Sequence, residues 1–219
     1  MSDATATSAL RPDSPLQSVG FRWLMLFRIC TLLSYQVAAV TVGWHIYELT
    51  RDPWSLGLVG LAEVIPFFCV APFSGYLVDH LPRRKLGAAA CLGLAINAGA
   101  LALIAHGALP TSALWPIYAA VAVGGVGRSF LGPVYNALFA RVLKREQFGR
   151  GASMGSVVFQ AGLVLGPALG GVLVGVAGKS VAYGLAAVFA IAAALALLRM
   201  RVTEPAITDA LPSAVSRSF

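Results

Sequence analysis

Six long blocks of apolar residues follow one another along the chain, and each is long enough to cross a bilayer as a helix. They lie at residues 23–47, 56–78, 86–105, 114–138, 154–176 and 181–198. A helix rises about 1.5 Å per residue, so about 20 residues cross a hydrocarbon core of about 30 Å. A helix also satisfies its own backbone hydrogen bonds in lipid. The sequence therefore predicts an all-α integral membrane protein with six transmembrane helices.

The charge content excludes a soluble globular fold. Only 11% of the 219 residues are charged and 58% are hydrophobic, whereas soluble domains carry about 25% charged residues. A net charge of +7 would suit a nucleic-acid partner in a soluble protein. Here the positive residues lie between the apolar blocks, which is typical of cytoplasmic loops. The expected partner is therefore the lipid bilayer and not nucleic acid.

The distribution of Lys and Arg predicts which helix ends face the cytoplasm. Most of the 16 basic residues lie before the first block, in the second and fourth connections, and after the sixth block. The first, third and fifth connections hold only Arg51 and Lys179. Because cytoplasmic loops are enriched in Lys and Arg, we expect both termini on the cytoplasmic side of the cell inner (plasma) membrane.

The two ends of the chain differ in composition from the blocks between them. Residues 1–20 are polar, and no short apolar stretch with a cleavage site precedes the first block; we therefore expect no cleaved signal peptide. Residues 202–219 are also polar. Both segments are expected to be disordered and cytoplasmic, flanking a six-helix bundle over residues 21–201.

The connection after the second block combines a glycine, a carboxylate and a basic run, Gly75-Tyr-Leu-Val-Asp79-His-Leu-Pro-Arg83-Arg84-Lys. A glycine at a helix end lets another backbone approach closely. A carboxylate at the membrane rim can face the N-terminus of a neighbouring helix, where the dipole favours negative charge. The basic run can contact anionic lipid headgroups. The alternative interpretation is an ordinary positively charged cytoplasmic loop.

This spacing resembles the loop motif of the major facilitator superfamily, which reads Gly, three residues, Asp, a basic residue, any residue, Gly and two basic residues. Gly75, Asp79, Arg83 and Arg84 match it. His80 stands where the first basic residue is usual, and Pro82 where the second glycine is usual. A proline before paired arginines resembles one branch of the family, the enterobactin-exporter and macrolide-efflux-like proteins.

The resemblance to this branch covers residues 21–200 and extends to segments 43–50, 55–61, 128–130, 145–148 and 159–160. It implies the N-terminal six-helix half of a transporter that works by alternating access between two bundles. It further implies proton-coupled efflux of small amphiphilic molecules. On the same basis, Asp79 is expected to face a helix end in a second bundle.

Small residues recur along the fifth block around a proline, at Gly162, Gly166, Pro167, Gly170 and Gly171. Small residues four positions apart form a groove for close helix packing, and a proline bends a helix because it removes one hydrogen bond. The alternative to a specific function is a generic packing face. The Gly-Pro followed by Gly-Gly resembles the family's antiporter motif, which implies export by exchange.

Polar side chains within the blocks are candidate functional residues, because charge inside a membrane is costly. Arg28, Thr31 and Tyr35 form a polar stripe on the first helix, where we expect Arg28 to snorkel to the cytoplasmic interface. Glu63 is a candidate for proton or cation coupling, or else a structural hydrogen-bonding group. Arg128 is a candidate for cavity lining, gating or tying helices together. Helix depth places Glu63 nearer to Arg128 than to Arg28, although a Glu63–Arg128 pair would need long side chains or an intervening water.

The sequence contains no hydrolytic constellation, phosphate-binding loop or metal-ligand spacing. We therefore expect no cofactor, no metal and no enzymatic activity.

Six helices are half of the number usual for the family. We hypothesise a truncated or frameshifted chain, a second bundle supplied in trans, or a homodimer. A non-transporting membrane scaffold or accessory subunit is the alternative function.

Overall fold

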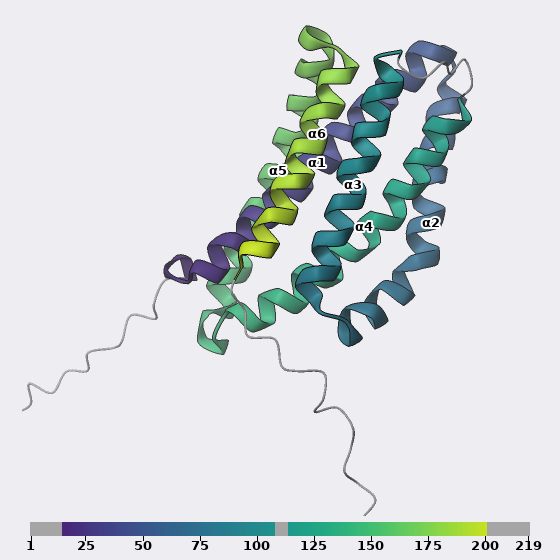
Figure 1. Ribbon diagram of the computed structural model, residues 1–219. Coiled ribbons are helices and arrows are strands. Elements are labelled where there is room, and N and C mark those ends of the chain that lie inside the picture. The colour runs from purple at the N-terminus through teal and green to yellow at the C-terminus, as the bar shows by residue number, and fades with distance from the viewer. Residues whose placement is uncertain (1–14, 108–113, 201–219) are drawn as a thin grey trace, which may run out of the picture.

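The computed structural model describes residues 15–107 and 114–200, which are helical along almost their whole length (Figure 1). A short 3-10 helix, η1 (Pro15–Gln17), precedes the first long helix, and another, η2 (Arg145–Gln147), precedes the fifth. The long helices are α1 (Val19–Thr50), α2 (Pro53–His80), α3 (Arg83–Ala105), α4 (Trp115–Val142), α5 (Phe148–Ala177) and α6 (Lys179–Arg199). All six are long and apolar enough to cross a membrane, so the predicted all-α fold with six transmembrane helices is confirmed.

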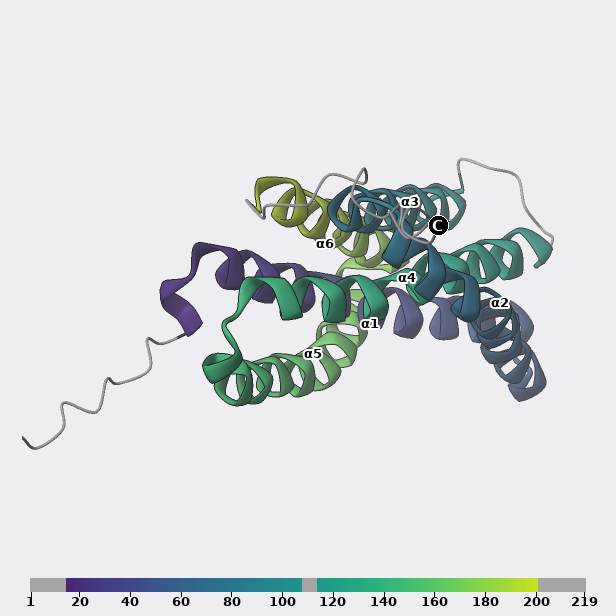
Figure 2. The same cartoon turned by 90° about the horizontal axis from the view of Figure 1, so that it is seen from below.

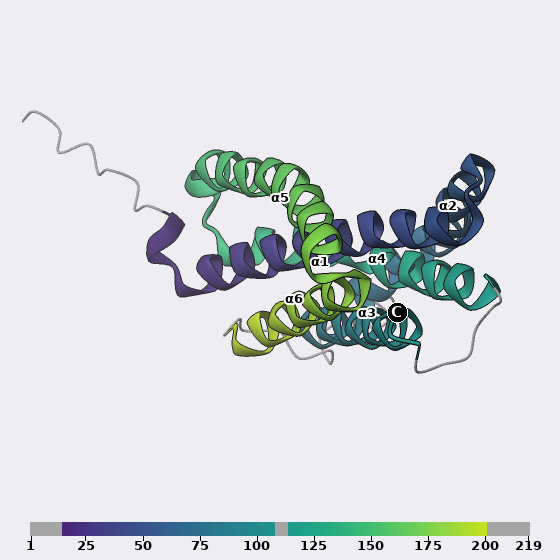
Figure 3. The same cartoon turned by 90° about the horizontal axis from the view of Figure 1, so that it is seen from above.

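The helices form three layers of two (Figures 2 and 3). Helices α1 and α4 lie in the middle layer, with α3 and α6 on one side and α2 and α5 on the other. The main contacts pair α1 with α5 and α6, α4 with α2 and α3, and α3 with α6. This pattern is unchanged when α1, α2 and α3 are exchanged for α4, α5 and α6. The bundle therefore contains an internal three-plus-three repeat of the kind found in transporters.

Small side chains allow α3 and α6 to pack closely. The buried residues of α6 include Ala182, Ala186, Ala190 and Ala193, and α3 contributes residues such as Ala95. In lipid, helices associate through van der Waals packing, and small residues let the backbones approach. By contrast, many large apolar residues of α2 and α5 are exposed in the isolated chain. Thus α3 and α6 form the packed side of the bundle, and α2 and α5 leave an apolar side open.

Serine hydroxyls join the layers through hydrogen bonds to backbone carbonyls. Ser34 on α1 donates to the carbonyl of Ala186 at 2.8 Å. Ser74 on α2 donates to the carbonyl of Ser129 at 3.0 Å. Both serines are buried, so these bonds satisfy hydroxyl groups that would be costly to leave unpaired inside the membrane.

The helices are longer than the apolar blocks predicted, mainly at the end of the bundle where α1 begins and α4 ends. The segment between the fourth and fifth apolar blocks is largely helical, because α4 continues to Val142 and α5 begins at Phe148. The expected disorder of residues 1–20 is wrong for residues 15–20, where Ser18 caps α1 by accepting from the amide of Phe21. The expected disorder of residues 1–14 and 202–219 lies outside the described residues. Polar residues continued these helices because capping and turn geometry, and not only hydropathy, determine where a helix ends.

Candidate functional site

An intramembrane ion pair joins α2 to α4 near the middle of the bundle. The carboxylate Oε1 of Glu63 lies 2.5 Å from the guanidinium Nη1 of Arg128, which donates a hydrogen bond to it. The Glu63 side chain is 18% exposed and that of Arg128 is 38% exposed. Helix depth alone allowed either long side chains or an intervening water to bridge these residues. The structure shows direct contact, because the long arginine side chain covers the remaining separation.

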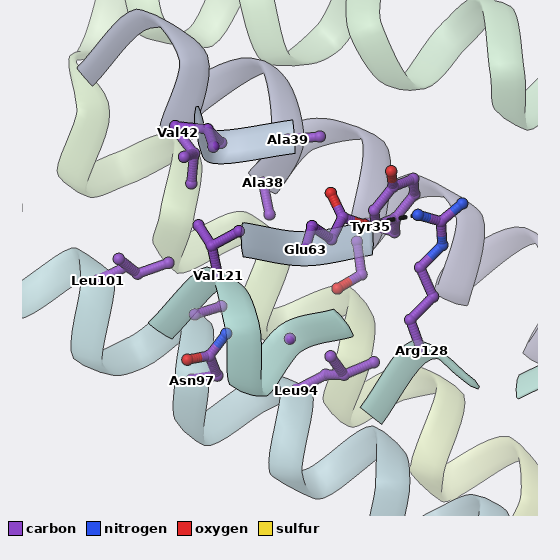
Figure 4. Close-up of a pocket in the computed structure, with 14 residues that line it drawn as sticks. Tyr35, Ala38, Ala39, Val42, Glu63, Leu94, Asn97, Leu101, Val121 and Arg128 are labelled. Carbon is purple, nitrogen blue, oxygen red and sulfur yellow. Dashed lines mark hydrogen bonds and ion pairs between the residues drawn. The ribbon is translucent and has the colours of Figure 1, made fainter. Parts of the chain in front are cut away.

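Tyr35 completes this group from α1. The Arg128 guanidinium carbon lies 3.7 Å from the centroid of the Tyr35 ring and 5.6 Å from that of Phe67 on α2. Figure 4 shows Tyr35, Glu63 and Arg128 pointing toward one another. A guanidinium over an aromatic face is attracted by the ring quadrupole. The positive charge of Arg128 is therefore held by a carboxylate on one helix and by aromatic rings on two.

Gly125 explains why α2 and α4 come close enough for this pair. A Cβ atom at Gly125 would collide with the backbone carbonyl oxygen of Glu63. Any residue other than glycine would therefore push the two helices apart at the level of the carboxylate. Gly125 is buried and lies on α4 one turn before Arg128. Its role is not evident from the sequence, because a glycine in an apolar helix gives no sign of which neighbour it contacts.

Two cavities meet at Tyr35 and Arg128. The first, of about 100 Å³, is lined by Tyr35, Glu63 and Arg128 together with Asn97 and apolar residues. The second, of about 330 Å³, is lined by Arg28, Tyr35, Arg128 and several aromatic and apolar side chains. The predicted polar stripe of α1 thus faces the cavities. The candidates Glu63, Arg128, Arg28 and Tyr35 all line one or both of them.

The expectation that Arg28 snorkels to the cytoplasmic interface is wrong. Its guanidinium carbon lies 3.8 Å from the centroid of the Tyr135 ring on α4 and 5.2 Å from that of Phe159 on α5. The side chain is only partly exposed and lines the larger cavity. Aromatic rings inside the bundle hold the cation there, so the side chain does not have to reach the headgroups.

The residues of the loop motif lie at the end of α2 and the start of α3. Asp79 is 71% exposed and lies 3.8 Å from Arg83, one turn further along the chain. Arg84 donates from Nε to the carbonyl of Leu197 at 3.1 Å and from Nη2 to that of Leu198 at 2.5 Å. Arg84 therefore ties the start of α3 to the last turn of α6. A Cβ at Gly75 would meet nothing within 4 Å, so no neighbour approaches this glycine within the described part of the chain.

Three glycines of the Gly-Pro segment form the contact between α5 and α1. A Cβ at Gly162 would lie 2.8 Å from the Cβ of Leu32, and one at Gly170 would lie 3.2 Å from the Cα of Val37. A Cβ at Gly166 would collide with the Cβ of Gln36. The predicted groove of small residues is thus a packing face against α1. Gly171 faces open space, and the α-helix continues through Pro167.

Comparison with known proteins identifies relatives that are transporters. A family model described as Major Facilitator Superfamily matches residues 24–216. The uncharacterized MFS-type transporter YfiS of Bacillus subtilis is 23% identical over 152 residues, which cover 69% of this chain and 32% of that protein. Macrolide efflux protein A of Streptococcus pyogenes is 22% identical over 144 residues, which cover 65% of this chain and 35% of that protein. The match thus spans about a third of the length of these relatives.

Proposed function

Because this chain belongs to the major facilitator superfamily, and is thus a multi-pass membrane protein of a transporter family, we propose that it exports small amphiphilic molecules in exchange for protons. A relative named as a macrolide efflux protein supports the direction of transport. The same relatives favour a transporter over a non-transporting scaffold. The observation that carries the proposal is the Glu63–Arg128 ion pair at the junction of two cavities inside the membrane.

Glu63 is the proposed proton-coupling residue. Its carboxylate faces a cavity and has one positively charged partner, Arg128. Protonation of Glu63 removes its negative charge and with it the ionic attraction that joins α2 to α4. Because α2 and α4 are neighbours in the bundle, proton binding at this position would alter how strongly these two helices hold together. Arg128 would respond directly because it donates to this carboxylate, and Tyr35 would respond through its contact with Arg128.

The proposed transport cycle needs a second bundle. In secondary transporters, alternating access occurs by rocking one bundle against another around a site near the bilayer midplane. The open apolar side formed by α2 and α5 is the proposed contact surface. The second bundle would be a further six-helix unit, supplied in trans or by a homodimer. Asp79 is exposed at the end of α2, and on the proposed cytoplasmic side it would face a helix end of that unit.

The test is the accumulation of a panel of cationic, neutral and anionic amphiphiles in the source cells, with and without an intact chain. We expect at least one class to accumulate more when the chain is disrupted, and the difference to disappear with a protonophore. Glu63→Gln should abolish the response to the proton gradient, whereas Asp52→Asn, on the exposed connection between α1 and α2, should preserve it. Equal accumulation of every compound in both strains would refute export.

A further inference from the structure

The two intramembrane arginines occupy equivalent places in the three-plus-three repeat. Arg28 on α1 stacks on Tyr135 of α4 at 3.8 Å, and Arg128 on α4 stacks on Tyr35 of α1 at 3.7 Å. On each helix the tyrosine follows the arginine by seven residues, which places both side chains on one face. The second ring near each arginine comes from an equivalent helix as well, α5 for Arg28 and α2 for Arg128.

The two halves of the repeat differ in whether the arginine has a carboxylate partner. Arg128 has Glu63 as its charged partner, whereas Arg28 forms no ion pair with any residue that the structure describes. The Nε atom of Arg28 is buried and has no hydrogen-bond partner within the same part of the chain. An aromatic face attracts the cation but accepts none of its five N–H groups in ordinary hydrogen-bond geometry. An unpaired donor of a charged group is costly to bury.

The surroundings of Arg28 have the composition of a ligand site. The cavity beside it has a volume of about 330 Å³ and contains both Arg28 and Arg128 in its wall. The remainder of the wall is mostly aromatic or aliphatic and includes Phe159, Leu131 and Leu163. Such cavities bind organic molecules through apolar contacts, and a few polar groups fix the orientation. The walls of the two cavities together hold two guanidinium groups and one carboxylate, so among the described residues one positive charge remains without a counter-charge.

We propose that Arg28 is the anion-recognition residue of this cavity and that the preferred ligand is an amphiphile with a single carboxylate group. The carboxylate oxygens accept hydrogen bonds from the part of the Arg28 guanidinium that lines the cavity. The apolar part of the ligand lies against Phe159 and Leu163. Arg128 does not take this role, because Glu63 already neutralises it. The inference rests on the proposed export function in that it names the class of substrate.

Matched ligands test the proposal without requiring transport. The probes are 2-naphthylacetate and its neutral analogue 2-naphthylacetamide, titrated against the purified full chain in nanodiscs of zwitterionic lipid. We expect the carboxylate to bind at least about tenfold more tightly than the amide, since a charged hydrogen bond contributes that much or more. Arg28→Gln should remove the preference and leave the affinity for the amide unchanged. Arg28→Lys should retain part of the preference for the carboxylate, because the positive charge remains but the planar set of guanidinium N–H donors is lost.

Arg22→Gln is the control, because Arg22 lies on the same helix but is exposed and outside the cavity. It should keep the full preference for the carboxylate. Size-exclusion profiles and thermal transitions establish that each variant is folded; if Arg28→Gln is not, the Arg28→Lys result is decisive. Equal binding of the two probes to the wild-type chain, or an unchanged preference in a folded Arg28 variant, would overturn the proposal.

Three further outcomes distinguish this inference from lipid binding and from the proposed export function. If anionic phosphatidylglycerol in the nanodisc eliminates the preference for the carboxylate, the site binds a lipid headgroup, and the assignment of the substrate class is wrong. If the chain exports only cationic compounds in cells, the inference fails while the proposed export function stands. If no compound is exported but the Arg28-dependent binding preference holds, the export function fails and the anion site stands.

Discussion

The carboxylate of Glu63 on α2 contacts the guanidinium of Arg128 on α4, with 2.5 Å between Oε1 and Nη1. Arg128 also stacks on the ring of Tyr35, and all three residues line the smaller cavity. A charge pair, an aromatic ring and a cavity therefore meet at one point. Removing one partner of a buried pair costs about 3–5 kcal/mol because a charge is left uncompensated. An exposed pair contributes about 0–1 kcal/mol. The partial exposure of Arg128 places this pair between those limits.

We therefore expect Glu63→Gln and Arg128→Gln each to lower the free energy of unfolding by about 1–3 kcal/mol. The double variant should be more stable than the sum of the two single effects predicts, because it leaves no isolated charge. Thermal unfolding in detergent of all four proteins provides the double-mutant cycle. Additive effects would show that the two side chains do not interact in the folded protein.

A second prediction concerns the glycine contact between α5 and α1. Gly166→Ala places a methyl group against Gln36, and overpacking of this kind costs about 1–3 kcal/mol. Gly171→Ala is the matched control on the same helix, because nothing lies within 4 Å of its added methyl group. Thermal stability should fall for Gly166→Ala and remain equal or rise for Gly171→Ala, since alanine favours a helix over glycine. A similar effect of both substitutions would exclude a specific packing role for Gly166.

The number of helices, their order and the polar face of α1 could be predicted from the sequence, because long apolar blocks have few other stable structures in lipid. The same is true of the small-residue groove on α5. The helix ends were less predictable. Ser18 starts α1 through a cap, and polar residues extend α4 and α5 beyond their apolar blocks, so hydropathy alone gives ends that are too short.

The interaction partners of the charged residues could be identified only from the structure. Periodicity shows which residues share a face of one helix, but it does not show which helices are neighbours. Arg28 was therefore assigned to the headgroup region, although Tyr135 and Phe159 from two other helices hold it inside the bundle. In the same way, the contribution of Gly125 depends on the backbone of Glu63 lying directly opposite. Pairing between helices is thus the information that a single sequence lacked.

The third prediction concerns the contact between Arg84 and the end of α6. The last carbonyls of a helix have no partner within that helix, and Arg84 donates to two of them, those of Leu197 and Leu198. Arg84→Gln should lower the thermal stability by an amount equivalent to about 1–3 kcal/mol, as for other hydrogen bonds to charged groups. Lys85→Gln, the exposed neighbouring position, changes the charge equally and should have little effect. Equal losses in the two variants would assign the effect to loop charge and not to the contact with α6.

The last prediction concerns orientation in the membrane. The basic residues between α2 and α3 and between α4 and α5 predict that these connections are cytoplasmic. His106, at the end of α3, and Glu146, between α4 and α5, are both exposed and belong to opposite ends of the bundle. In a chain whose native cysteines Cys30, Cys69 and Cys91 are replaced, His106→Cys should react with a membrane-impermeant maleimide in intact cells. Glu146→Cys should react only after permeabilisation, and the parent chain should not react. Labelling of Glu146→Cys but not of His106→Cys in intact cells would reverse the topology and would place Asp79 and the basic residues around it outside the cytoplasm.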